Sequence, residues 1–193
     1  GRVETQIDGG AGDDIINVTD NRAGSTTSSN GNEYGIAKVT IDGGEGDDEI
    51  TVSGGLDVSI TTGGGSDVIS LTAKQYRTLI EGARNISNDN GSSEVVDAKP
   101  ISITDFTAGN SGDVLDYGDL LRNGTLAYDG SNPFSTGFIK LEQSGADTLI
   151  RFDQDGSASN EKSAVIVAVL KNVTASELIA DNFNPNFPPG GST

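Results

Sequence analysis

Glycine and aspartate recur in this sequence at a spacing that suits a metal-binding turn. The segment 7–17 (IDGGAGDDIIN) is matched by 41–51 (IDGGEGDDEIT), and a weaker copy at 62–70 (TGGGSDVIS) keeps the glycine, aspartate and apolar positions. Glycine permits the positive φ that lets carbonyl oxygens point into a tight turn, and the aspartate adds a carboxylate to them. Calcium takes about six to eight oxygen ligands, more than one turn supplies, so the repeat predicts calcium between two stacked turns.

The spacing of the aspartates indicates a coil of two short strands and two turns. Asp48, Asp57 and Asp67 follow one another at steps of nine and ten residues, with a half-copy of the repeat (SGGLDV) around Asp57. The step from Asp14 to Asp48 is 34 residues, which corresponds to one coil plus about sixteen more. The polar residues 20–37 are therefore expected to form an insertion that loops out of the stack.

Two other kinds of chemistry use glycine-rich turns. Ordinary Gly-Asp turns in an all-β protein need no metal. Recurrence of the nonapeptide, with an apolar residue two places after each aspartate, favours calcium, because this pattern is a known calcium-binding repeat. A phosphate-binding loop is excluded, because paired aspartates would repel phosphate and the Lys-Ser/Thr ending is missing.

The repeats at 8–17, 42–51 and 62–70 resemble those of the RTX family, the glycine-rich proteins exported by bacterial type I secretion. The resemblance implies a parallel β-roll with calcium ions between successive turns. It implies eight calcium ligands, namely the carboxylates of Asp14, Asp48 and Asp67 and the carbonyl oxygens of Gly9, Ala11, Gly43, Glu45 and Gly64. The strongest expected site lies between the turns of Asp48 and Asp67. A second site, between the turns of Asp14 and Asp48, requires the insertion to leave the stack.

The second half of the chain also resembles this family. Residues 103–109 (ITDFTAG) and 112–116 (GDVLD) are similar to the segment that follows the roll in RTX adhesins and proteases. Residues 147–156 (DTLIRFDQDG) and 169–174 (VLKNVT) are similar to the family's C-terminal secretion region. The resemblance implies an uncleaved export signal read by the type I secretion apparatus, and hence a secreted or cell-surface protein.

Five further aspartates are weaker candidates for calcium ligands: Asp57, Asp105, Asp113, Asp153 and Asp155. Asp57 has no partner one coil away. Asp105 and Asp113 either close the last calcium turn or are solvated turn residues, two readings of equal weight. The loop that begins at Asp153 could supply oxygen ligands, although its glycine does not fall where an EF-hand needs it; an acidic hairpin loop is the favoured alternative.

Composition excludes several classes of function. The chain of 193 residues carries 12 Lys and Arg against 29 Asp and Glu, a net charge of −17. This excess repels phosphate backbones and anionic lipid, so nucleic acid and membrane surfaces are not expected partners. Cys and His are absent, which removes thiolate metal sites, disulfides and the commonest general base. No apolar run is long enough for membrane insertion, and no motif of a known reaction class is present, so no catalysis is expected.

The expected fold class is all-β, with a short calcium-binding parallel β-roll followed by a β-rich C-terminal domain with one or two short helices. We expect the roll at 1–71 with its insertion at 20–37, a capping helix and linker at 72–99, and the secretion region at 100–193. A brief helix beginning at Thr72 would place Tyr76, Leu79 and Ile80 on one face and cap the roll. The spacing of Thr174 and Glu177 predicts a capping box for a second helix. The tail is expected to be loose from 184 onward.

Together, these expectations describe a non-catalytic module for calcium-dependent folding and type I secretion, at the C-terminus of a large bacterial surface adhesin. The alternative parents are an extracellular enzyme, such as a serralysin-type protease or an alginate-modifying enzyme, a toxin, or a surface-layer protein. A stand-alone polysaccharide-binding module is a separate class. The scarcity of aromatic residues counts against it, because sugars stack on aromatic rings.

Overall fold

A computed structural model describes the backbone of residues 2–19, 35–82, 84–87, 93–125, 128–158 and 163–190. The expected insertion at 20–37 lies outside the described residues except for 35–37, which open a strand. Residues 88–92 of the expected linker likewise lie outside them.

Strands dominate the described residues and form three sheets. The strands are β1 (Arg2–Asp8), β2 (Ile15–Thr19), β3 (Gly35–Asp42), β4 (Glu49–Ser53), β5 (Asp57–Thr61), β6 (Val68–Ser70), β7 (Arg84–Ser87), β8 (Ser93–Val96), β9 (Ile101–Ile103), β10 (Val114–Asp116), β11 (Ile139–Ser144), β12 (Asp147–Phe152), β13 (Val165–Leu170) and β14 (Phe183–Asn184). The helices are α1 (Ala73–Glu81) and α2 (Gly118–Gly124), with 3-10 turns at Gly156–Ala158, Ala175–Glu177 and Ala180–Asn182. The expectation of a mostly β fold with few short helices is confirmed.

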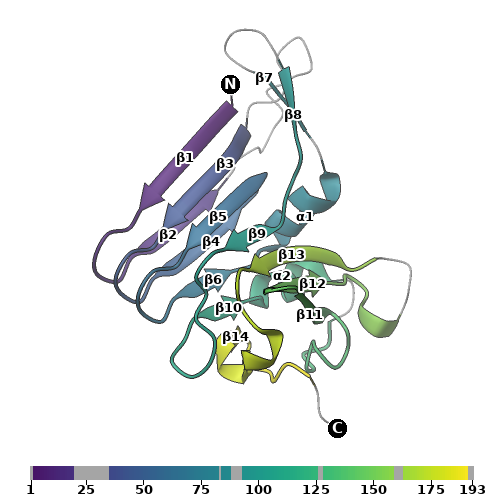
Figure 1. Ribbon diagram of the computed structural model, residues 1–193. Helices are drawn as coiled ribbons and strands as arrows, with labels where there is room; N and C mark the ends of the chain where they lie inside the picture. Colours follow the sequence, from purple (N-terminus) through teal and green to yellow (C-terminus); the bar gives the residue numbers. More distant parts are fainter. Residues whose placement is uncertain are drawn as a thin grey trace.

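The chain passes back and forth between two sheets (Figure 1). A seven-stranded sheet has the order β1-β3-β5-β9-β13-β12-β11, and a five-stranded sheet has the order β14-β10-β6-β4-β2. From β1 to β6 the strands alternate between the two sheets, and each pairs in parallel with the equivalent strand of the next coil. The two sheets are therefore built by successive coils of the repeat.

Matching positions of the repeat stand in register, which explains the buried core. Ile7 pairs with Ile41, and Ile41 pairs with Ile60. The inward side chains are almost fully buried: Val39, Ile41, Ile50, Val52, Val58, Ile60 and Ile69 are at most 1% exposed. Burial of each such side chain contributes about 1.5–3 kcal/mol. The outward Ile15 is 71% exposed, because successive residues of a strand face opposite sides.

The later strands extend the same sheets. β9 pairs with β5 of the last repeat and with β13, and β10 pairs with β6 and β14. Antiparallel pairing of β11, β12 and β13 then completes the seven-stranded sheet. Residues on both sides of the expected linker at 72–99 thus share two sheets, with α1 and the β7–β8 hairpin between them in sequence.

Helix α1 closes the edge at which β4 turns into β5. Its N-cap is Thr72, whose hydroxyl accepts from Gln75 N, so the predicted helix start is confirmed. The buried Gln75 side chain accepts from Gly54 N at 2.8 Å and donates to Gly55 O at 2.8 Å, which satisfies the backbone of that turn. Tyr76 is buried and meets Phe152 edge-to-face at 4.8 Å.

Three local predictions were wrong. Ile80 is 52% exposed and does not join the buried face of α1, because the helix packs through Ala73, Gln75, Tyr76 and Thr78. Thr174 makes no side-chain cap, and only 3-10 turns follow it. The chain is still held beyond 184, since Asn184 pairs through β14 and Pro185 O accepts from the Tyr117 hydroxyl at 2.6 Å.

Within the described ranges, no helix is long and apolar enough to cross a membrane.

Candidate metal centre

Three turns of the repeat, residues 9–14, 43–48 and 62–67, stack directly on one another. Isolated bridges join Ala11 to Glu45 and Glu45 to Gly64. The turns lie one behind another at one edge of the two sheets (Figure 1). Turns 9–14 and 43–48 are neighbours although a long segment separates them in sequence.

Glycine is required where these turns touch. Gly44 has a φ of +104°, and a Cβ there would come within 1.9 Å of Gly10 O. An L-residue would be strained by that φ and would collide with the neighbouring backbone. The close stacking of the repeat therefore depends on its second glycine.

The inward aspartates of successive turns are linked in a ladder. Oδ1 of each accepts the main-chain N–H of the aspartate before it: Asp14 N donates to Asp48 at 2.8 Å, Asp48 N to Asp67 at 2.9 Å and Asp67 N to Asp113 at 3.1 Å. The predicted ligands Asp14, Asp48 and Asp67 thus stand in one row, and Asp113 continues it.

The other oxygen of these aspartates has no such partner. Among the described residues, Oδ2 of Asp14, Asp48 and Asp67 is buried and makes no hydrogen bond. Asp48 and Asp67 are 1% and 0% exposed. A buried carboxylate oxygen without a donor is costly unless a cation or a proton satisfies it.

A carbonyl oxygen lies close to two of these unpaired oxygens. The position of a Cβ on Gly9 would be 2.3 Å from Gly43 O and 3.0 Å from Asp14 Oδ2. On Gly43 it would be 2.3 Å from Thr62 O and 2.5 Å from Asp48 Oδ2. We call these two places the Gly9 cradle and the Gly43 cradle. Each is bounded by one carboxylate and one carbonyl oxygen and is closed to any side chain on its glycine. Hard oxygen donors of this kind suit calcium.

The remaining predicted carbonyl ligands lie in the same turns. Glu45 O accepts from Gly12 N at 2.6 Å, and Gly64 O accepts from Gly46 N at 2.7 Å. These two carbonyls thus accept main-chain hydrogen bonds that join neighbouring turns. Thr62 O was missed as a candidate ligand, although its alignment with Gly9 and Gly43 was a signal that could have found it.

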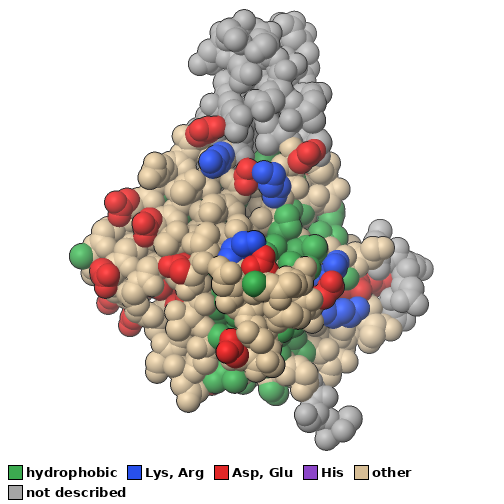
Figure 2. Space-filling view, viewed as in Figure 1, with side chains coloured by type: hydrophobic (Ala, Val, Ile, Leu, Met, Phe, Trp, Pro, Cys, Tyr) green, Lys and Arg blue, Asp and Glu red, His purple; other side chains and the backbone are tan. Residues whose placement is uncertain are grey.

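Carboxylates on the outer side of the turns do not form a separate cluster. Asp13 and Asp47 are exposed, and each accepts the N–H of the following turn, from Asp47 at 2.9 Å and Ser66 at 2.8 Å. Red side chains gather along this edge of the surface (Figure 2). Across the described part of the chain, no group of three or more His, Cys, Asp or Glu side chains is placed to hold a metal. A site in this stack would therefore rely on main-chain oxygens as well as aspartates.

Burial makes the negative charge of Asp67 and Asp113 unfavourable. Burial, together with repulsion from the neighbouring Asp113 and Asp48 carboxylates, raises the pKa of Asp67 to about 6. Burial also raises the pKa of Asp113, although N–H donors from Thr107 and Asp67 oppose this. Both shifts favour the protonated, neutral form of the carboxyl group.

The fourth member of the row is built differently. Asp113 is 1% exposed and Asp105 is exposed, and both contact the third turn. Asp105 Oδ1 accepts from Thr62 N at 2.8 Å, and Asp105 Oδ2 accepts from Gly63 N at 3.0 Å. The Thr62 hydroxyl lies 3.1 Å from Asp105 Oδ1 and 3.2 Å from Asp113 Oδ2.

The other weak candidates are not brought to the stack. Asp57 forms an exposed ion pair with Lys99 at 2.8 Å. Asp153 is buried and lies 3.6 Å from Lys140 Nζ, and Asp155 N donates to its Oδ1 at 3.4 Å. Burial raises the pKa of Asp153 and the neighbouring Asp155 side chain adds to this effect, whereas the hydrogen bond from Asp155 N opposes it. The sequence around Asp153 therefore forms a separate acidic loop.

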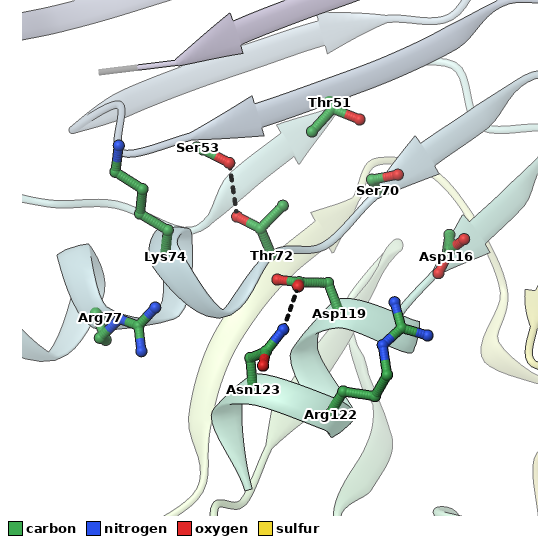
Figure 3. Close-up of a pocket in the computed structure, with 10 residues that line it drawn as sticks. All are labelled: Thr51, Ser53, Ser70, Thr72, Lys74, Arg77, Asp116, Asp119, Arg122 and Asn123. Atoms are coloured by element: carbon green, nitrogen blue, oxygen red, sulfur yellow. Dashed lines mark hydrogen bonds between the residues drawn. The ribbon is translucent and has the colours of Figure 1, made fainter. Parts of the chain in front are cut away.

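A polar cavity of about 560 Å³ lies elsewhere, beside β4, β6 and both helices (Figure 3). It is lined by Thr51, Ser53, Ser70, Thr72, Lys74, Arg77, Asp116, Asp119, Arg122 and Asn123. Its two carboxylates accept main-chain hydrogen bonds: Asp119 accepts from Ala73 N at 2.9 Å, and Asp116 accepts from Gly118 N at 2.7 Å. None of the lining residues belongs to the stacked turns.

Comparison with known proteins assigns no family. No family model matches the chain, and no curated protein matches it. Among solved structures, the chain is similar to the AlgE6R3 subunit of the Azotobacter vinelandii mannuronan C5-epimerase, with 16% identity over 91% of this chain and 78% of that one. The TM-score is 0.28, so this likeness carries no argument.

Proposed function

We propose that the repeat half of this chain is a short calcium-binding β-roll of the RTX type, whose folding depends on the ions it binds. One observation carries the proposal: the buried Oδ2 atoms of Asp14 and Asp48 make no hydrogen bond among the described residues, and each lies beside a carbonyl oxygen at a glycine cradle. A calcium ion near each cradle would satisfy both oxygens. Further ligands would come from the stacked turns and from water.

Ion binding would then drive folding. The unfolded chain has no preformed site, so the free energy of binding adds to the free energy of folding. At a calcium concentration of 100 times Kd, each ion adds about 2.7 kcal/mol. Without calcium, the net charge of −17 and 27 glycines favour the open chain, through repulsion and backbone entropy.

This coupling suits a protein that is exported unfolded and folds outside. Cytoplasmic calcium is too scarce for sites with Kd of about 10⁻⁴–10⁻³ M, the range of extracellular modules. The likeness of residues 103–116 and 147–174 to RTX C-terminal segments supports export by a type I apparatus. The chain would then be the non-catalytic folding and secretion module of a bacterial surface adhesin.

Circular dichroism of the full 193-residue chain tests the calcium step. Spectra are compared in calcium-free buffer, in calcium at about 1 mM or above, and in magnesium at the same concentration. We expect β structure to appear with calcium and much less with magnesium, which is smaller and demands octahedral geometry. Full β structure in calcium-free buffer at neutral pH would refute calcium-dependent folding.

Export is tested separately. A passenger protein fused to the N-terminus of this chain should reach the medium from bacteria that carry a type I apparatus, and should stay inside cells that lack it. Retention in both strains would refute the secretion role while leaving the calcium role intact.

A further inference from the structure

The third turn departs from the first two at the position of its first glycine. Thr62 stands where Gly9 and Gly43 stand, because Asp42 pairs with Thr61 and Glu45 bridges to Gly64. The Cβ of Thr62 therefore takes the place that a Cβ on Gly43 would take in its own turn. That place is the cradle, so the third turn has none.

The next coil also presents different atoms to this turn. In the first two turns, the N–H at this position donates to a carbonyl of the following coil: Gly9 N to Asp42 O and Gly43 N to Thr61 O, each at 2.9 Å. In the third turn, Thr62 N donates to the Asp105 carboxylate at 2.8 Å. Where the first two turns meet a main-chain carbonyl, Thr62 meets a side chain.

The two carboxylates that face the third turn, Asp105 and Asp113, accept hydrogen bonds from main-chain N–H groups. Asp105 accepts N–H groups from Thr62 and Gly63. Asp113 accepts from Asp67 N at 3.1 Å with Oδ1 and from Thr107 N at 2.8 Å with Oδ2. Each of these four oxygens has a main-chain donor, unlike Oδ2 of Asp14, Asp48 and Asp67.

We infer that Thr62, Asp105 and Asp113 form a hydrogen-bonded cap that ends the row of calcium sites, so that the stack holds two ions and not three. The inference rests on the proposed function, since it concerns the same row of turns. Asp113 and Asp105 are cap residues, not calcium ligands. Asp14 and Asp48 serve the two ions.

Calorimetric titration and native mass spectrometry of the full chain with calcium test the cap. We expect two ions in the stack for the wild type and for Thr62→Ser, which keeps both the Cβ and the hydroxyl. Thr62→Gly removes the side chain that contacts Asp105 and Asp113 and should admit a third ion. A wild-type stack with three ions, or a Thr62→Gly stack with two, overturns the inference.

A second pair of variants covers the case in which Thr62→Gly does not fold. Asp113→Asn should keep both ions, although its thermal midpoint falls, whereas Asp48→Asn should lose one. Loss of an ion in Asp113→Asn would overturn the cap. Ions bound outside the stack, for example at Asp153, are assigned by Asp153→Asn and subtracted. A wild type that binds no calcium would instead refute the proposed function, so the two failures are distinguishable.

Discussion

The main-chain N–H of Asp48 donates a 2.9 Å hydrogen bond to Oδ1 of Asp67, which lies 19 residues further along the chain. The same bond joins Asp14 to Asp48. Oδ1 of Asp48 and of Asp67 thus holds two coils together, while Oδ2 of each makes no hydrogen bond within the described residues. In the proposed calcium sites, stacking and metal binding would therefore use different atoms of the same side chain, and substitutions can separate them.

Asp48→Asn and Asp48→Ala separate the two roles. The asparagine keeps an oxygen for Asp14 N but loses the charge, so we expect at least tenfold weaker calcium binding at one site, equivalent to about 1.4 kcal/mol. The alanine loses the hydrogen bond as well and should unfold at lower temperature with or without calcium. Titration calorimetry and thermal melts measure both effects.

Asp57→Asn is the matched control for that pair. Asp57 forms an exposed ion pair with Lys99, and exposed pairs contribute about 0–1 kcal/mol. We expect unchanged calcium affinity and stoichiometry. Calcium binding that falls as far in Asp57→Asn as in Asp48→Asn would show that general acidity, and not the stack, holds the ions.

Acid should favour folding of the metal-free chain. Burial raises the pKa of Asp67 from 3.8 to about 6, so the folded state binds this proton more tightly than the unfolded state. The contribution to stability is present below pH 3.8 and is lost as pH rises through about 6. Dichroism in calcium-free buffer should therefore show more β structure near pH 4.5 than at pH 7. Asp67→Asn should reduce this pH dependence, and an equal dependence in both proteins would contradict the assignment.

Gly43→Ala should destroy one cradle. The added Cβ would lie 2.3 Å from Thr62 O, which is backbone and cannot move aside, and 2.5 Å from Asp48 Oδ2. We expect the loss of one ion and destabilisation by about 1–3 kcal/mol, typical of overpacking. Gly64→Ala is the control, because its Cβ would meet only the mobile end of the Glu45 side chain at 3.0 Å. Equal effects of the two changes would argue against a cradle at Gly43.

The repeat could be predicted from the sequence because its chemistry is local. The glycines and the aspartate of one turn lie within a short stretch of sequence, and the apolar residue that follows, such as Ile50, faces the core. The cap at Thr62 could not be predicted in the same way, since Asp113 reaches the third turn only after the 46 residues that separate it from Asp67. Strand β10 depends on distant partners in the same way. Its three residues are too few for a periodic pattern, and pairing with β6 and β14 holds them.

The edge of the coil opposite the metal-binding turns should be independent of calcium. There, Gln75 of α1 accepts from Gly54 N and donates to Gly55 O, both at 2.8 Å, and it is 2% exposed. Gln75→Ala would leave a buried N–H and a buried carbonyl without these partners, so we expect a loss of about 2–4 kcal/mol. Arg77→Ala, an exposed position on the same helix, should cost less than about 0.5 kcal/mol. Both variants should keep the wild-type number of ions. Loss of an ion in Gln75→Ala, measured by calorimetry on folded protein, would mean that the two edges are coupled through β4 and β5.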